Sequence, residues 1–419
     1  MVESHANSVD DYLIEGLSFK LTPGASYVTN RRSVSFFPSG SDSYSSTSGV
    51  KVIKVKLNGT DWLDPSTVKV MFTVNNTAGT MSFLSGGHSF FRRLRVVCNG
   101  QIVEDIDDYN RVCEMFNVLQ SSSVRTNDEI EAVPRWDNGA PETLAVSKSR
   151  RFGMKLCSGL LNQTKMLPIR YCPLELELEL VNAVDDCQVG STGWNISDIQ
   201  IKCDLCTLDN ALENSYAKHL FEGKALPINY STYISQSQTT SNFDFTINVA
   251  RAVTRLKSVF LSMVGTNPTS AQTPNLKEFN NFWHPMCTES TSGGYNSQKE
   301  IELHVQIGSK LFPEYPIRSA SESFSQLRKT MGIHQSPFHS LDINGPQYRS
   351  YKFIASVDTE KVLEAGFTGL NTRAGDLMTI KVKPLDSVAM AATKPTKFFT
   401  VLHSDNIMEI RESGITVFD

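Results

Sequence analysis

No stretch of this sequence is apolar over the roughly 18 residues that a membrane-crossing helix needs. Neither end carries a block of lysine and arginine, and 44 acidic side chains outnumber 40 basic ones. Because proteins that neutralise nucleic acid draw most of their affinity from such basic groups, we expect no direct, sequence-specific binding of nucleic acid. The first residues also lack the basic and apolar regions of a signal peptide, so we expect a soluble protein that is not secreted by that route. Contact with a membrane surface stays open.

Catalytic signatures are missing as well. The sequence has no nucleophile elbow, phosphate-binding loop, dinucleotide fingerprint or zinc-protease motif. Only two of its eight histidines, His334 and His339, lie close together, whereas a metal-dependent enzyme built on a β-barrel needs clustered ligands on facing strands. We therefore predict no enzymatic activity, no catalytic or cofactor-binding residue, no cofactor and no metal site. Convergence in space of dispersed histidine, serine and aspartate side chains remains the alternative.

Two cysteine-containing clusters resemble fragments of metal sites. Cys203 and Cys206 form a single CxxC motif, but on a strand an offset of three directs the two sulfur atoms to opposite faces. His284 and Cys287 lie in a predicted loop without a second ligand pair. In a chain without a signal peptide, we expect all eight cysteines to be reduced.

Charged clusters are better explained by structure than by ligand binding. The acidic residues 104–108 stand where a helical pattern begins, so we predict that they cap that helix rather than bind a cation. The basic pairs Arg31-Arg32 and Arg92-Arg93 lie beside predicted strands. We predict that they form ion pairs across a sheet or at a subunit contact.

The informative feature that is present is a repeated order of elements. Residues 94–103 form a β-rich run bent at Gly100 and followed by a helical pattern, and residues 303–312 repeat this around Gly308, about half the chain away. Other strands match between the halves in the same order. The pair 50–57 and 67–74 of the first half corresponds to the pair 243–249 and 255–264 of the second, and the later pair 174–181 and 197–208 corresponds to 377–382 and 397–402. Such an order indicates an all-β unit that was duplicated and fused, and it is typical of two tandem eight-stranded jelly rolls with short helices.

The alternation of residues 174–180 puts four leucines on one face and three glutamates on the other, which predicts a half-buried antiparallel strand. Leu208, Leu212, Tyr216 and Leu220 recur at helical spacing ahead of Gly223 and Pro227, which predicts a helix that links the two barrels. The predicted organisation is an N-terminal arm at 1–30, a first jelly roll at 31–208, a linker helix at 209–226 and a second jelly roll at 227–419.

Three further segments carry expectations. Residues 8–21 have the spacing of a short amphipathic helix, with a partly disordered leader as the alternative. Residues 120–149 and 265–298 are long and rich in turn-forming residues, so we expect outward-facing loops there.

A family resemblance joins these observations. The chain resembles the double jelly-roll major capsid proteins of polinton-like viruses, adintoviruses and virophages, and the likeness runs from about residue 17 to the C-terminus. The residues that carry it are Arg31-Arg32-Ser33-Val34-Ser35-Phe36 with Tyr44-Ser45, Trp62-Leu63-Asp64-Pro65, Ser89-Phe90-Phe91-Arg92-Arg93-Leu94, and Gly366-Phe367-Thr368-Gly369-Leu370 running into Gly375-Asp376-Leu377.

The resemblance implies a structural subunit of an icosahedral capsid around double-stranded DNA. Three copies would form a pseudo-hexameric capsomer, which would contact neighbouring capsomers, penton proteins and minor capsid proteins in a virion assembled in the host cytoplasm or nucleus. The compact loops of this chain depart from larger relatives and leave host attachment open. A carbohydrate-binding, lectin-like jelly-roll module is the alternative, and a cupin-type enzyme is disfavoured by the scattered histidines.

Overall fold

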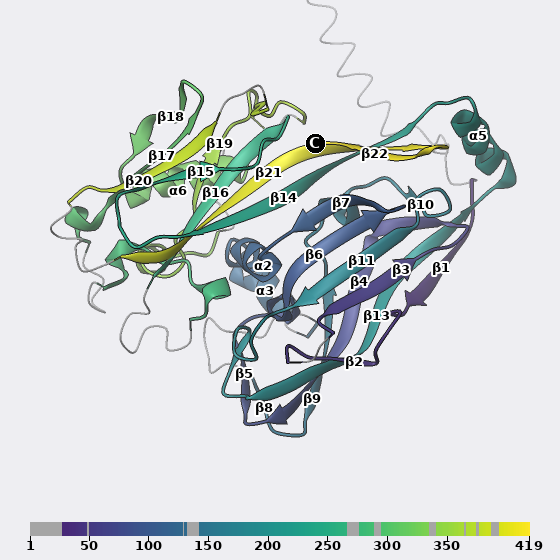
Figure 1. The fold of residues 1–419 in the computed structure, drawn as a ribbon, viewed down its shortest axis with the longest axis horizontal. Helices are drawn as coiled ribbons and strands as arrows, with labels where there is room; N and C mark the ends of the chain where they lie inside the picture. The colour runs from purple at the N-terminus through teal and green to yellow at the C-terminus, as the bar shows by residue number, and fades with distance from the viewer. Residues whose placement is uncertain are drawn as a thin grey trace, which may run out of the picture.

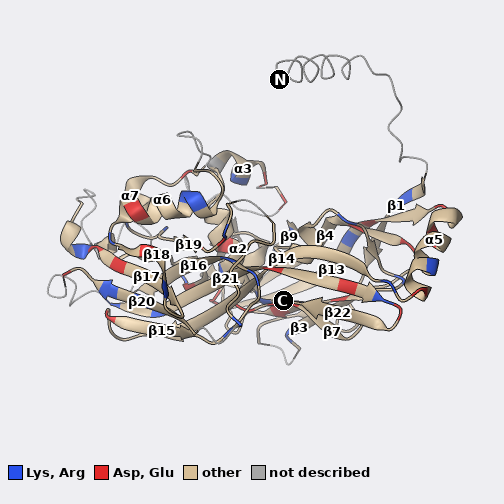
Figure 2. Cartoon of the chain, turned by 90° about the horizontal axis from the view of Figure 1, so that it is seen from above, with Lys and Arg blue, Asp and Glu red and all other residues tan. Residues whose placement is uncertain are grey.

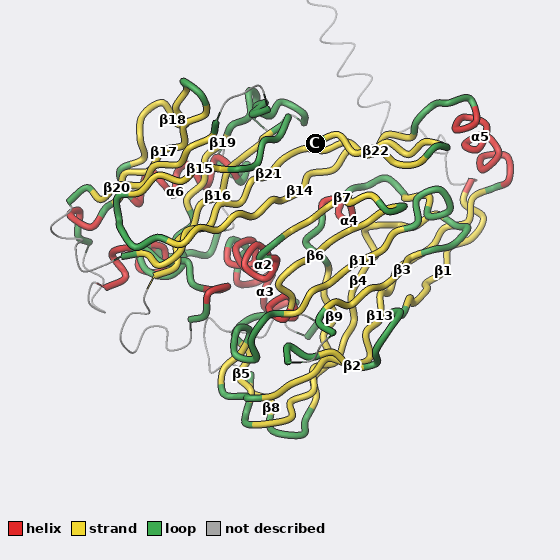
Figure 3. The backbone as a smooth tube through the Cα atoms, in the orientation of Figure 1, coloured by secondary structure: helices red, strands yellow, loops and turns green. Residues whose placement is uncertain are grey.

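The computed structural model describes residues 27–47, 50–128, 130–131, 142–265, 276–288, 295–334, 341–363, 366–373, 377–386 and 394–419. The segment 8–21, expected to form a helix, lies outside these residues. Strands dominate, and the few helices are short (Figure 3). The strands form five sheets whose strand pairings are all antiparallel (Figure 1). In the described part of the chain, no helix combines the length and apolarity that crossing a bilayer requires.

The first half contains two facing sheets. One has the order β1 (Val28–Phe36), β13 (Gly193–Leu208), β4 (Trp62–Ala78) and β9 (Ser149–Lys155), with the short strands β2 (Ser43–Tyr44) and β10 (Leu167–Pro168) attached. The other has the order β3 (Val52–Leu57), β11 (Leu174–Leu180), β6 (Phe91–Cys98) and β7 (Gln101–Ile106). A small third sheet has the order β12 (Gln188–Val189), β5 (Met81–Phe83) and β8 (Thr143–Leu144).

The second half repeats this arrangement. Its first sheet has the order β14 (Leu226–Thr239), β21 (Pro395–Arg411), β16 (Leu256–Gly265) and β19 (Ala355–Asp358), with β22 (Gly414–Phe418) paired to β21. Its second sheet has the order β15 (Phe245–Val249), β20 (Met378–Pro384), β17 (Ile301–Ile307) and β18 (Lys310–Ile317). In both halves, eight principal strands are therefore divided in the same way between two sheets, which confirms the predicted pair of jelly rolls.

The helices lie in the connections. They are η2 (Gly87–Phe90), α2 (Tyr109–Val118), α3 (Ser122–Asn127), α4 (Gly159–Asn162), α5 (Asn210–Phe221), η3 (Glu278–Asn280), η4 (Pro285–Thr288), η5 (Ser297–Lys299), α6 (Ala320–Thr330) and α7 (Gly345–Tyr348). In each half a helix, α2 or α6, follows the hairpin that bends at the repeated glycine. In the first hairpin, Asn99 and Gly100 both have positive φ, 47° and 82°, which suits a two-residue turn between antiparallel strands.

The connection between the halves differs from a simple linker helix. Asp209 caps α5 by accepting a hydrogen bond from the Ala211 amide, and Leu220 is the buried side chain of this helix. Figure 1 places α5 at the end of the first barrel that is remote from the second one. From α5, the long strand β14 carries the chain to the second barrel, and β21 pairs alongside it (Figure 1). At the N-terminal side, β1 begins at Val28, inside the segment assigned to the arm, because its backbone pairs with β13 from there on.

The cores of the two barrels are continuous. One cluster of buried apolar side chains includes Phe72 and Leu176 in the first half and Val305 and Phe398 in the second. Side chains of α2 join the two sets, because Phe116 contacts Tyr233 and Phe260 of the second half.

Candidate functional site

The junction between the two barrels contains a network of buried polar contacts, and α2 of the first half lies in it (Figure 1). Arg111 on this helix is 2% exposed. Its guanidinium donates to the carbonyl oxygen of Glu278, to the carbonyl oxygen of Asn281 (3.0 Å) and to Oγ of Ser262 (3.0 Å). It also donates over 3.4 Å to the carbonyl oxygen of Met263. A cation of the first barrel thereby holds two segments of the second, the stretch 278–281 and β16.

Two aromatic rings enclose the same guanidinium. Its central carbon lies 4.6 Å from the ring centroid of Phe282 and 4.2 Å from that of Phe399. Burial lowers the pKa of Arg111 to about 9, so the side chain is still charged at neutral pH. Such stacking and forked hydrogen bonding are available to arginine and not to lysine.

Apolar and backbone contacts extend the junction along β14. The ring of Phe116 on α2 lies 4.8 Å from that of Tyr233 and 5.6 Å from that of Phe260. The hydroxyl of Tyr230 donates to the carbonyl oxygen of Val103 in β7 over 3.0 Å. These contacts hold the first strand of the second barrel against the first barrel.

A short helix, α4, approaches β14 more closely than a side chain allows. A Cβ placed on Gly159 would overlap the carbonyl oxygen of Ser231. The buried carboxylate of Glu104 accepts hydrogen bonds from the α4 amides of Gly159 (2.9 Å) and Leu160 (3.3 Å) and from the hydroxyl of Ser158. Burial raises the pKa of Glu104. Glu104 therefore fixes α4 where only glycine lets the two backbones meet.

This finding corrects one prediction about the acidic run. Asp108 precedes α2 in a left-handed conformation, and its side chain makes no capping hydrogen bond to that helix. The carboxylate of Glu104 accepts hydrogen bonds from amides of α4 instead. Asp105 forms an ion pair with Arg93 (2.7 Å). The alternation of a strand, which turns every second residue inward, overrides the capping role that we expected.

A cavity of about 530 Å³ opens at the junction. It is lined by charged residues of both barrels, but oppositely charged groups pair around it: Lys277 with Asp185 (3.0 Å) and Lys397 with Glu278 (2.6 Å). Paired charges leave little to attract an ionic ligand, so we interpret this cavity as part of the junction.

The basic pairs form ion pairs across the sheets, as predicted. Arg31 contacts Asp64 and Asp204, each at 2.9 Å, and Arg32 contacts Asp61 at 2.6 Å. Acidic and basic residues both occur on either barrel (Figure 2).

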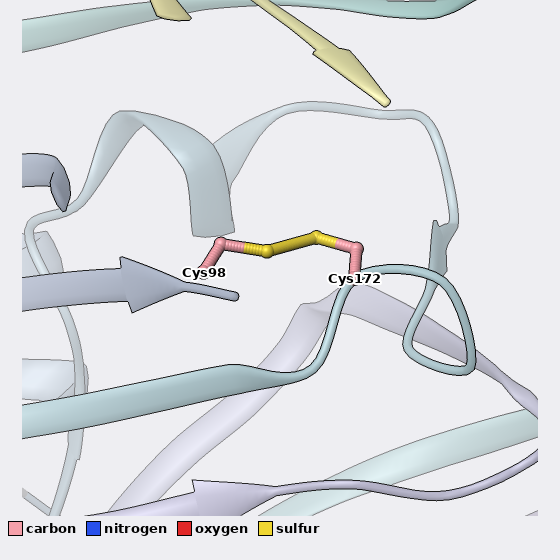
Figure 4. Close-up of a disulfide and its surroundings, with 2 residues drawn as sticks. All are labelled: Cys98 and Cys172. Atoms are coloured by element: carbon pink, nitrogen blue, oxygen red, sulfur yellow. A yellow bond between two sulfur atoms is a disulfide. The ribbon is translucent and has the colours of Figure 1, made fainter. Parts of the chain in front are cut away.

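The cysteines correct a second prediction. Cys98 at the end of β6 and Cys172 before β11 form a disulfide, with their Cα atoms 5.9 Å apart, a separation that suits such a bond (Figure 4). Our expectation that all eight cysteines are reduced is therefore wrong for this pair, which tertiary structure brings together across 74 positions. Cys203 faces the core cluster and Cys206 lies outside it, as the strand offset predicts.

The loop 265–298 also differs from our expectation. The described stretch 276–288 lies against the second barrel, and its aromatic side chains Phe279, Phe282 and Trp283 are at most 2% exposed. Carbonyl groups of this stretch accept from Arg111. Burial of the aromatic residues makes this part of the segment a piece of the junction rather than an outward-facing loop.

Dispersed polar residues do converge at one place that the sequence did not reveal. Ser85, His88 and Glu114 lie together, with His88 Nε2 3.2 Å from the serine hydroxyl and 2.9 Å from the glutamate carboxylate. Burial acts to raise the pKa of Glu114, but the hydrogen bond and charge interaction with His88, together with hydrogen bonds from Ser85 and Asn117, outweigh burial and lower this pKa. Serine and carboxylate share the same ring nitrogen, so the imidazole does not bridge them as a catalytic triad requires.

Histidine and cysteine do not assemble into a metal site in the part of the chain that the structure describes, where no three potential ligands converge. His284 is completely buried, its Nδ1 accepts from the Met286 amide over 3.1 Å, and burial lowers its pKa to about 3. The absence of a metal or cofactor stays a prediction.

Known proteins resemble this chain in their solved structures and not in their sequences. No family model matches the chain, and no curated protein matches it. Among solved structures, the chain is similar to VP54 of the virus PBCV-1, in a crystal structure fitted into a reconstruction of the virophage Sputnik. The identity is 14%, the TM-score is 0.62, and the match covers 96% of this chain and 99% of that chain.

Two further matches also cover at least 90% of both chains. The Faustovirus major capsid protein matches with 8% identity and a TM-score of 0.61 over 94% of this chain and 92% of that chain. A structure of the Sputnik virophage matches with 11% identity and a TM-score of 0.58 over 96% of this chain and 90% of that chain. At such identities the likeness concerns the fold, and this chain has the double jelly-roll fold of these capsid proteins.

Proposed function

We propose that this protein is the major capsid protein of an icosahedral double-stranded DNA virus and that it has no enzymatic role. The observation that carries the proposal is a match of both barrels together, over 96% of this chain and 99% of a capsid protein chain. A lectin or a cupin-type enzyme would need only one of these barrels.

The junction supports the proposal on physical grounds. A capsid subunit is held by neighbours on several sides, so its two barrels have to keep one relative orientation. The buried contacts of Arg111, Phe116 and Gly159 fix that orientation. Three such subunits present six similar lobes, which lets a three-fold capsomer occupy a six-fold lattice position.

The proposal includes assembly and location. The chain self-associates into a homotrimer, and capsomers then contact one another, penton proteins and minor capsid proteins in a virion that assembles in the host cytoplasm or nucleus. We propose four parts of the chain: the arm at 1–30, the first jelly roll at 31–208, the linker helix at 209–226 and the second jelly roll at 227–419. The first strand, β1, begins at Val28, within the last residues of the arm.

Light scattering coupled to size-exclusion chromatography tests the proposal. We expect a trimer of about 140 kDa, from chains of 46.6 kDa, and capsid-like particles or capsomer arrays in electron micrographs at higher concentration. A monodisperse monomer that forms no particles would contradict the proposal and favour the lectin-like alternative.

A further inference from the structure

A second cavity, of about 460 Å³, is lined by residues of α6 and α7. These two helices lie near each other on the second barrel (Figure 2). Phe324, Ile343 and Tyr348 supply apolar surface to the cavity, and Tyr295, Ser321 and Arg349 add polar groups. Its size lies in the range of small-molecule sites, about 300–1,000 Å³, and a mainly apolar wall with a few polar groups is their usual composition.

The inner wall of this cavity is rigid. The rings of Phe324 and Tyr348 meet edge to face at 5.1 Å. The hydroxyl of Tyr348 bonds to the hydroxyl of Ser323 and to the carbonyl oxygen of Ile354, both at 2.9 Å. Tyr348 is 4% exposed, so its polar atom is satisfied inside and its ring serves the cavity as an apolar surface.

Tyr295 contributes an exposed aromatic ring in a fixed position. The side chain is 54% exposed, yet its hydroxyl bonds to the buried carboxylate of Glu300 at 2.5 Å. The other oxygen of Glu300 accepts from the Ala320 amide at the start of α6 (3.0 Å). A ring that is already immobilised loses little conformational entropy when a ligand stacks on it.

Arg349 contributes a positive charge. Its Nε donates to the carbonyl oxygen of Gly345 (3.1 Å), and its guanidinium lies 5.4 Å from the ring centroid of Tyr295. Among the described residues it forms no ion pair, and no acidic side chain lines the cavity. The junction cavity, by contrast, has its charges paired.

We propose that this cavity binds a small sugar that carries a carboxylate, such as a sialic or uronic acid. The terminal nitrogens of Arg349 match the geometry of a carboxylate, the ring of Tyr295 offers a face to the apolar side of a sugar ring, and the Ser321 hydroxyl is a partner for a sugar hydroxyl. The inference goes beyond the capsid role and does not depend on trimer formation.

Saturation-transfer NMR on the full-length protein tests this inference, with N-acetylneuraminic acid and glucuronic acid as probes and galactose and glucuronamide as neutral partners. We expect the acids to bind at least tenfold more tightly than the neutral sugars. Arg349→Gln should weaken acid binding at least tenfold, and Tyr295→Ala should weaken binding of the same acids.

Matched controls keep the test independent of folding. Tyr315→Ala removes an aromatic ring that is 81% exposed on β18, and Arg251→Gln removes an exposed arginine of the same barrel that does not line the cavity. Both should leave sugar binding unchanged, and these two controls and Arg349→Gln should keep the melting temperature of the parent. Tyr295→Ala should lower it slightly, because one oxygen of the buried Glu300 carboxylate loses its hydrogen bond. Equal binding of acidic and neutral sugars would overturn the inference. So would unchanged binding by Arg349→Gln, or occupation of the cavity by an acidic aromatic peptide in place of any sugar.

Discussion

Arg111 provides the most direct test of the junction. Replacing Arg111 with alanine removes four hydrogen bonds to acceptors of the second barrel and two ring contacts. Hydrogen bonds from a charged donor contribute about 1.5–3 kcal/mol each, so the four together contribute about 6–12 kcal/mol. Burial of the cation opposes them. The lowering of its pKa from 12.5 to about 9 corresponds to a cost of about 5 kcal/mol.

The difference predicts that Arg111→Ala lowers the free energy of unfolding by about 1–7 kcal/mol, with about 4 kcal/mol at the centre of the range. Arg111→Lys should lower the free energy of unfolding by nearly as much as Arg111→Ala, because one ammonium group does not reach four acceptors while stacking between two rings. Urea denaturation followed by tryptophan fluorescence, at one fixed protein concentration, measures these changes.

Arg92→Ala is the matched control. Arg92 lines the same cavity but is 44% exposed and lies 3.9 Å from Glu179, so its loss should cost about 0.5 kcal/mol or less. If Arg111→Ala destabilised the protein no more than Arg92→Ala, the guanidinium would not be holding the barrels together and the reasoning would fail.

Three other perturbations have defined outcomes. Gly159→Val should force β14 away from α4, because even a Cβ at this position overlaps the β14 backbone. The variant should have a lower melting temperature and a lower yield of trimer in light scattering. A valine that changes neither value would refute the close approach of the two backbones. Burial lowers the pKa of His284 to about 3 and of His403 to about 4. Below about pH 6.5 the unfolded chain therefore binds protons that the folded chain does not, so the free energy of unfolding should fall as the pH drops towards 4. At pH 5 we expect a loss of about 2 kcal/mol per histidine. Urea denaturation at pH 7.5 and pH 5 measures this, and His403→Phe should reduce the loss by about half. Peptide mapping without reductant should recover Cys98 joined to Cys172, and replacing both by serine should cost about 2–4 kcal/mol, while recovery of two free thiols from protein purified under oxidising conditions would count against the bond.

The repeated strands could be predicted from the sequence because their signals are local. Alternation along residues 174–180 and the glycine bends at 100 and 308 depend on neighbours in the chain, and the order of such signals was enough to indicate two jelly rolls.

The junction could not be predicted in the same way, because its contacts join residues far apart in sequence. Arg111 on an amphipathic helix resembles a solvated residue. The signal that was available is its spacing of four from Met115 and seven from Val118, both buried, which places a charge on the apolar face. In the same way, three large aromatic residues between 279 and 283 distinguish a buried segment from an outward-facing loop. The pairing of Cys98 with Cys172 has no local signal at all.

The pairing of the first strand with the last long strand of each barrel sets an order of events during synthesis of the chain. β1 pairs with β13, so the first barrel can close once residue 208 has left the ribosome. β14 pairs along its whole length with β21, which ends at Arg411, so the second barrel can close only after residue 411 has left the ribosome. Until then, the strands that hold the partners of Phe116 and Arg111 do not yet form a closed barrel. The nascent protein therefore passes through a period in which a finished barrel exposes an unfinished apolar face, the stage at which chaperone binding or premature association would act.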